Sequence, residues 1–116
     1  VLASDTDSLA VRATAENAAL NQAGAHLRVQ LGSADVLQQL LAGALADLLL
    51  CNILAPVLTA LTPAFSELLT ARGEGLLSGL LVDQAPALTA HLEAHGWRVT
   101  TEAEQGRWAL LAIQRA

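Results

Sequence analysis

Short apolar runs alternate with longer segments of helical periodicity along this chain, and this alternation constrains its fold more than any other feature. Polar residues or glycine bound the apolar runs, as is typical of buried strands: Val1–Ser4, Leu27–Leu31, Leu48–Cys51 and Gly75–Leu80. Helices are expected between them, over Leu9–Asn21, Asp35–Leu45, a segment after Thr62, and Asp83–His95. Alternating strands and helices predict an α/β fold with a doubly wound parallel sheet.

Two prolines decide how the third helical segment is interpreted. A proline inside a helix costs about 3 kcal/mol, so Pro63 is not expected in a helix interior. We expect a short turn from Pro56 and then a new helix with Thr62 as its N-cap and Pro63 at its first position. This helix is expected to end at Gly73.

The end of the chain has a different pattern. Two strand-like runs flank Glu102–Gly106, which predicts a closing antiparallel hairpin. Trp97 and Trp108 are expected to pack against each other or against the sheet through this hairpin.

Composition excludes several classes of protein. Hydrophobic residues make up 53% of the chain and charged residues 15%, which indicates a packed globular protein rather than a disordered one. The net charge is −5 and the six basic residues form no run, so free nucleic acid is a poor partner. Cys51 is the single cysteine and has no disulfide partner in the chain, which fits a reducing compartment. The apolar stretch Leu48–Leu61 is shorter than the roughly 20 residues that span a bilayer, so we expect a soluble, cytoplasmic protein without a membrane partner.

Polar residues or glycine follow each predicted strand, at the edge where ligands bind in doubly wound sheets. They are Ser4–Asp7, Gly32–Asp35, Asn52 and Ser78–Gly79. Asp5 is placed where nucleotide-binding folds hold a ribose diol with a carboxylate. The glycine fingerprint that accompanies such an acid lies about 20 residues before it, which is upstream of Val1.

Structural roles compete with these functional ones. Asp5 or Asp7 can simply cap the helix that follows. Asn52 can cap a helix before Pro56 or be a satisfied buried amide. His91 and His95 are spaced i, i+4 but have no third ligand at a useful spacing, so no metal site is expected.

Two segments also resemble a known family. The segment SDTDSLAVRATAENAALN resembles the part that follows a strand in class I S-adenosylmethionine-dependent methyltransferases. DLLLCNILAPVLTALTP, followed by GLLSGLL, is similar to the bacterial PrmA family, and so is the tail HLEAHGWRVTTEAEQGRWALLAI. The resemblance runs from Ala3 to Ile113 and matches the C-terminal part of that family's catalytic domain. Members methylate amino groups of large-subunit ribosomal protein eleven.

The resemblance implies roles for individual residues. Asp5 would bind the ribose of the methyl donor and Thr6 would lie near the adenine. Ser33 and Asp35 belong to the loop that would flank the adenine ring. Asn52 would be the catalytic residue, beside both the donor's sulfonium methyl and the incoming amine. The family's first strand, its glycine-rich turn and its N-terminal recognition domain have no counterpart in these residues, so one incomplete catalytic domain over 1–116, inactive by itself, is expected.

An amide suits position 52 for this chemistry. Methyl transfer to an amine is an in-line displacement that depends on holding the reacting atoms about 3–3.5 Å apart. An Asn carbonyl accepts an N–H from the neutral amine, without a charge that would hold the ammonium form. Amide and nucleobase N-methyltransferases carry Asn or Asp followed by Pro-Pro and an aromatic residue, whereas Ile-Leu-Ala follows Asn52.

Two other interpretations remain open from the sequence. One is an N-methyltransferase that acts on another amide or nucleobase nitrogen. The other is a non-catalytic interaction module that pairs with a partner, or with itself, through an exposed strand edge.

Overall fold

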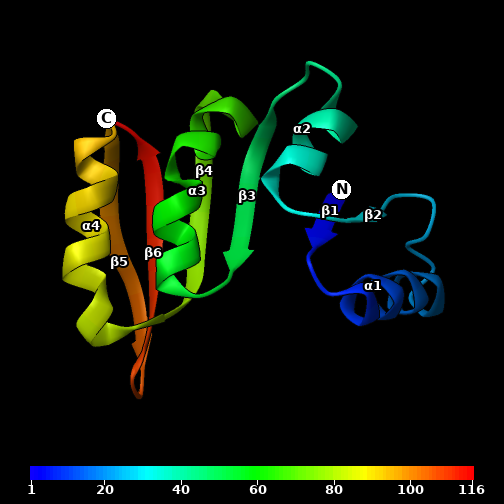
Figure 1. Ribbon diagram of the computed structural model, residues 1–116, viewed down its shortest axis with the longest axis horizontal. Helices are drawn as coiled ribbons and strands as arrows, with labels where there is room; N and C mark the ends of the chain where they lie inside the picture. The colour runs from blue at the N-terminus through cyan, green and yellow to red at the C-terminus, as the bar shows by residue number, and fades with distance from the viewer. The chain divides into compact units, whose positions relative to one another are not determined.

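The computed structural model describes residues 1–116 as two compact units, Val1–Ala44 and Leu45–Ala116. The first unit contains β1 (Leu2–Asp5), α1 (Ser8–Leu20), β2 (Arg28–Leu31) and α2 (Ala34–Leu41), as Figure 1 shows. β1 and β2 form a two-stranded parallel sheet in which Asp5 pairs with Leu31. Two strand–helix pairs therefore follow one another, and both strands end at the same edge.

The second unit forms a four-stranded mixed sheet. Its elements are β3 (Ala46–Asn52), α3 (Ala55–Leu68), β4 (Leu69–Leu81), the 3-10 turn η1 (Val82–Gln84), α4 (Ala85–Ala94), β5 (Trp97–Gln105) and β6 (Trp108–Arg115). The strand order is β3-β4-β6-β5, with β3 parallel to β4 and with β6 antiparallel to both of its neighbours. Figure 1 shows α3 and α4 on the same side of this sheet.

The core of the second unit lies between its two helices and the sheet. Its fully buried side chains come from α3, α4, β4 and β6 and are mostly leucine: Leu58, Thr62, Phe65, Leu69, Leu77, Leu80, Leu92, Leu111 and Ile113. The buried Trp97 ring meets Phe65 edge-on, with ring centroids 6.5 Å apart. The helices of the second unit therefore cover one face of its sheet, and the core is buried there.

The expected α/β fold and closing hairpin are confirmed, with tighter turns than expected. β5 and β6 are joined by Gly106 and Arg107 alone, so the hairpin arms extend through the predicted loop. Gly106 has φ +59°, which suits the first position of a two-residue hairpin turn. α2 ends at Leu41, earlier than expected, because Ala42 and Gly43 both adopt positive φ and break the helix.

The predicted break in the third helix is wrong. α3 is one continuous helix with Pro56 in its first turn and Pro63 inside it. It ends at Leu68 rather than Gly73, and Leu69 already begins β4. Burial of Leu58 and Phe65 on the same helix face contributes about 1.5–3 kcal/mol each and offsets the cost of the internal proline.

The strands form two sheets rather than one, β1-β2 and β3-β4-β6-β5. The expectation that all four parallel strand ends line one edge of one sheet is therefore wrong for these residues, because β1 and β2 end in one sheet and β3 and β4 in the other. None of the helices is both long enough and apolar enough to cross a lipid bilayer.

Candidate functional site

In the first unit, Asp5 and Asp7 have different partners. Asp7 is the N-cap of α1, and its Oδ1 accepts the backbone N–H of Leu9 at 2.9 Å. Asp5 ends β1, is exposed, and accepts the backbone N–H of Asp7 at its own Oδ1, also at 2.9 Å. Of the two acids that could cap this helix, Asp7 does so. Asp5 keeps its second carboxylate oxygen unbonded, and Thr6 is exposed between them.

The loop after β2 lies beside Asp5. The backbone N–H of Gly32 donates to the Asp5 carbonyl at 2.9 Å, which continues the β1–β2 pairing by one residue. Gly32 has φ +141°, and a Cβ there would come within 2.6 Å of the Val36 side chain, so this turn requires glycine. Ser33 precedes α2 without a side-chain cap, and its N–H donates to the Asp35 Oδ1 at 3.2 Å. The first unit therefore brings together Asp5 and the loop that carries Ser33 and Asp35.

Asn52 belongs to the second unit, where it is the last residue of β3. It pairs with Ser78 of β4, and the next residue, Ile53, donates its N–H to the Ser78 carbonyl at 3.1 Å. The N-cap of α3 is Leu54, so Asn52 does not cap that helix. Asn52 is also exposed, so it is not a satisfied buried amide. Both structural roles considered for Asn52 are therefore wrong.

Asn52 lines a cavity of about 450 Å³ at the carboxyl end of the parallel pair. The other lining residues are Ile53, Leu54, Ser78, Gly79 and Trp108. Its lining is thus largely apolar and includes one aromatic ring, with the Asn52 amide and the Ser78 hydroxyl as its polar side-chain groups. An apolar cavity with few polar groups is the usual form of a small-molecule or side-chain site.

Trp108 was not predicted to take part in a site. It does not pack against Trp97, because these residues lie at opposite ends of the β5–β6 hairpin, and 55% of its surface is exposed. Trp108 is the first residue of β6 and pairs with Leu81, at the end of β4. A strand that runs antiparallel to β4 must begin at the edge where β4 ends. This rule, applied to the predicted hairpin, identifies Trp108 as a residue of that edge.

Cys51 directly precedes Asn52 and is half-buried. Burial penalises the thiolate and raises the pKa of Cys51 from 9.0 to about 11. A thiol with this pKa is protonated at neutral pH and is a poor nucleophile. Cys51 therefore behaves as a small core residue rather than as a nucleophile.

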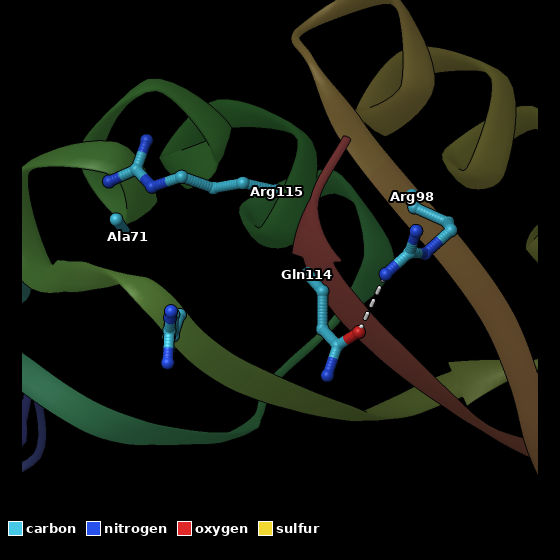
Figure 2. Close-up of a pocket in the computed structure, with 6 residues that line it drawn as sticks. Ala71, Arg98, Gln114 and Arg115 are labelled. Atoms are coloured by element: carbon cyan, nitrogen blue, oxygen red, sulfur yellow. Dashed lines mark hydrogen bonds between the residues drawn. The ribbon is translucent and has the colours of Figure 1, made fainter.

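A second cavity, of about 270 Å³, lies at the other end of the sheet and is rich in arginine (Figure 2). Its lining residues are Ala71, Arg72, Gly73, Arg98, Gln114 and Arg115. Arg98 donates to the Gln114 Oε1 at 3.0 Å, and Arg115 donates to the carbonyls of Ser66 and Leu69 at 2.8 and 2.9 Å. Arg115 thus satisfies carbonyl groups at the C-terminal end of α3, and these two arginines already hold neighbouring elements together.

The His91 and His95 rings stack at 4.4 Å on α4, and His95 Nδ1 lies 2.8 Å from the His91 carbonyl. His91 is half-buried and its Nε2 has no partner, so the pair is less exposed than the helical spacing suggested. No group of three or more His, Cys, Asp or Glu side chains is placed to hold a metal ion.

Comparison with known proteins gives consistent results. The family model described as ribosomal protein L11 methyltransferase (PrmA) matches residues 1–116. A ribosomal protein L11 methyltransferase of Synechococcus sp. (strain RCC307) is 98% identical over the whole chain. Another of the same name, from Parasynechococcus marenigrum (strain WH8102), is 60% identical over 99% of it. The chain spans only 38% and 40% of the lengths of these two relatives.

Solved structures show the same similarity. A ribosomal protein L11 methylase of Lactobacillus delbrueckii subsp. bulgaricus matches 99% of this chain and 57% of its own, with a TM-score of 0.84 and 33% identity. A fibrillarin pre-rRNA processing protein of Methanococcus jannaschii shares the fold at 14% identity, with a TM-score of 0.77 over 99% of this chain and 55% of its own. The incomplete Rossmann-like methyltransferase fold is thus confirmed. On the family match and these identities, the chain belongs to the PrmA family of ribosomal protein L11 methyltransferases.

Proposed function

We propose that this chain is the C-terminal part of the catalytic domain of an S-adenosylmethionine-dependent methyltransferase, and that its upstream part supplies the first strand and the glycine-rich turn. The reaction is methyl transfer to amino groups, a lysine side chain or an N-terminal amine, of ribosomal protein L11. One observation carries the proposal: in a PrmA-family chain, Asn52 is exposed at a parallel strand end and lines a cavity of about 450 Å³.

The donor-binding residues proposed for the first unit fit the polar part of S-adenosylmethionine. Asp5 has an unbonded carboxylate oxygen that can accept hydrogen bonds from a ribose diol. Thr6 follows it and is exposed, and the loop with Ser33 and Asp35 is tied to Asp5 through Gly32. These groups would hold the ribose and flank the adenine. Bound S-adenosylmethionine supplies an electrophilic sulfonium methyl, and Asn52 is proposed to lie beside it.

The second unit supplies what the acceptor amine needs. A lysine amine has a solution pKa of about 10.4 and must lose a proton before it can attack. The apolar side chains of Leu54 and Trp108 line the cavity, and partial desolvation of an amine bound against them disfavours its ammonium form. The Asn52 carbonyl accepts an N–H from the neutral amine and orients its lone pair, with no charge that would retain the proton.

The substrate and the location follow from the same proposal. Ribosomal protein L11 is the proposed partner because the matched relatives carry that name. The net charge of −5 favours a protein substrate over free nucleic acid. A cytoplasmic location and the lack of a membrane partner stay predictions.

The test uses the Synechococcus sp. (strain RCC307) relative, hereafter the full-length relative, in which the matched positions are substituted. We expect intact-mass analysis to show L11 gaining about 14 Da per transferred methyl when S-adenosylmethionine is present, a mass step set by the chemistry of the reaction. Digested peptides then locate the methylated nitrogen. Methylation of a nucleobase or a backbone amide, with L11 unchanged, would support the alternative N-methyltransferase and contradict the proposal.

One observation favours a second, non-catalytic function. β3 is an edge strand, and its Leu48 and Leu50 side chains are 52% and 68% exposed. Such an edge can pair with a partner or with a second copy. Size-exclusion chromatography with light scattering tests this, because a clean monomer at all concentrations would argue against self-association.

A further inference from the structure

A β-bulge in β4 lies directly beside Asn52. The pairing of β4 with β6 shifts between Leu77, which faces Leu111, and Leu80, which faces Ala109. Ser78 and Gly79 therefore stand opposite one residue instead of two, which is the pattern of a bulge. On its other side, β4 pairs with β3, and the last pair there is Asn52 with Ser78. Bulges beside sites commonly re-aim a neighbouring side chain.

Gly79 fits this bulge because it has no side chain. Its φ is +82°, a conformation that L side chains rarely adopt. A Cβ at this position would lie 2.6 Å from the Ile53 carbonyl oxygen, 2.7 Å from the Ile53 nitrogen and 2.9 Å from the Asn52 Oδ1. Two of these three atoms are backbone atoms and cannot move without shifting the chain after β3. Only a hydrogen atom fits between the bulge and the Asn52–Ile53 peptide.

A backbone hydrogen bond from β4 also holds the Asn52–Ile53 peptide in place. Ile53 donates its N–H to the Ser78 carbonyl at 3.1 Å, so the bulge bonds the backbone while Gly79 packs against it. The Asn52 Oδ1 lies close to the Gly79 backbone, because a Cβ added at Gly79 would lie only 2.9 Å from it. Asn52 is exposed and does not cap α3, so closeness to Gly79 is the feature that can restrict its amide.

We propose that Gly79 is a positioning residue for Asn52, and that the Ser78–Gly79 bulge fixes the direction in which the Asn52 amide meets the acceptor amine. The expected effect on methyl transfer rests on the proposed function. The expected restriction of the Asn52 amide by Gly79 does not depend on it. A side chain at position 79 displaces the amide oxygen and the Ile53 peptide together. Methyl transfer falls because the amine is no longer oriented, while Asp5 and the loop after β2, which belong to the other compact unit, keep their structure.

The geometry is tested in this chain without any substitution. NMR relaxation measures the order parameter of each side-chain amide, and Asn17, exposed on α1, is the internal control. We expect a value near that of rigid backbone, about 0.8, for the Asn52 amide and a value below about 0.6 for Asn17. An Asn52 amide as mobile as that of Asn17 would overturn the proposal, whatever reaction the family member performs.

The second test is a double-mutant cycle in the full-length relative, using the positions that match Gly79 and Asn52. Gly79→Ala is expected to lower kcat by about tenfold or more with little change in donor Kd. In an Asn52→Ala background the same substitution is expected to lower kcat by less than about twofold, because the residue it positions is gone. An equal loss in both backgrounds would show a general structural effect and overturn the proposal.

Gly96→Ala is the matched control. Gly96 has φ +88°, close to that of Gly79, but a Cβ there meets nothing within 4 Å. It therefore introduces the same backbone strain without the contact, and kcat is expected to stay within about twofold. If Asn52→Ala itself leaves kcat unchanged, the proposed function of Asn52 fails, and the relaxation measurement still decides the geometry. If Gly79→Ala does not fold, the relaxation measurement on the unsubstituted chain still tests whether the Asn52 amide is held in place.

Discussion

The Asp5 carboxylate accepts the backbone N–H of Asp7 at 2.9 Å, while the Asp7 carboxylate caps helix α1. Two acids that are two residues apart therefore have separate roles. Asp7 stabilises the helix, and Asp5 shapes the turn while one of its oxygens stays available to a ligand. From the sequence, either residue could cap the helix, and the hydrogen bonds in the structure show that Asp7 does so.

Substituting these two acids is expected to affect different measurements. Asp7→Ala removes an N-cap and should lower the free energy of unfolding by about 1 kcal/mol in a urea titration of this chain. Asp5→Asn keeps an oxygen that can accept the Asp7 N–H, so stability should change by less than about 0.5 kcal/mol. In the full-length relative, the same Asp5→Asn change should weaken S-adenosylmethionine binding by about tenfold, because the ribose loses a charged acceptor.

The two variants act as controls for each other. Donor binding that is unaffected by Asp5→Asn, or that falls equally with Asp7→Ala, would contradict the role proposed for Asp5.

Arg115 is expected to stabilise the second unit. Its guanidinium donates to the Ser66 and Leu69 carbonyls and lies 5.3 Å from the centroid of the buried Trp97 ring. Arg115→Met should lower the free energy of unfolding by about 1–2 kcal/mol, since two hydrogen bonds and a cation–π contact are lost. Arg98→Met is the control, because Arg98 is exposed and its bond to Gln114 links two surface side chains. Equal losses from the two substitutions, measured by urea titration, would count against this account.

The stability of the chain is expected to fall between pH 9 and pH 11 because of Cys51. Burial raises the pKa of Cys51 from 9.0 to about 11, so the folded chain holds this proton more tightly than the unfolded chain does. This contribution is complete below pH 9 and is lost as the pH rises to about 11, with a size on the order of 2 kcal/mol. The chain has no tyrosine and no lysine, so no other side chain titrates in that window.

Cys51→Ala should flatten this slope even if it changes stability at neutral pH. Urea titrations at several pH values give the slope directly. A slope that persists in Cys51→Ala would exclude Cys51 as its source.

This chain by itself is expected to bind S-adenosylmethionine weakly or not at all. The glycine-rich turn that holds the donor's methionyl part is expected upstream of Val1, so only the contacts around Asp5 and the loop after β2 remain. Isothermal titration of the 116-residue chain should therefore give no heat at micromolar donor concentrations. A dissociation constant in the low micromolar range would contradict this expectation.

The sequence predicted the order of the elements well because local patterns decide them. Short apolar runs and periodic segments predicted the order of the strands and helices, although the loop expected over Glu102–Gly106 is shorter, because β5 continues to Gln105. The continuity of α3 could not be predicted, because the cost of Pro63 is local while the burial of Phe65 against the sheet is tertiary. The N-terminal half of β4 was missed for the same reason, since Leu69 suits a helix end and a strand start equally well.

Within the candidate site, sequence reasoning identified residues but not their neighbours. Asn52 was located because a polar amide interrupts an apolar run, a signal that a single sequence carries. Trp108 reaches the same cavity through antiparallel pairing, 56 positions later in the chain, and no local pattern marks it. Ser78–Gly79 was identified as a strand end, but its close approach to the Asn52–Ile53 peptide appears only in the structure.

The most direct test of the account is methyl transfer to ribosomal protein L11 by the full-length relative with the position of Asn52 substituted. Asn52→Ala should lower kcat by about a hundredfold while donor Kd changes by less than about threefold, because the amide aims the amine. Asn52→Asp should shift the pH dependence of kcat/KM to higher pH, since its charge stabilises the ammonium form. A kcat and a pH profile that remain unchanged in both variants would contradict the central claim that Asn52 orients the acceptor amine.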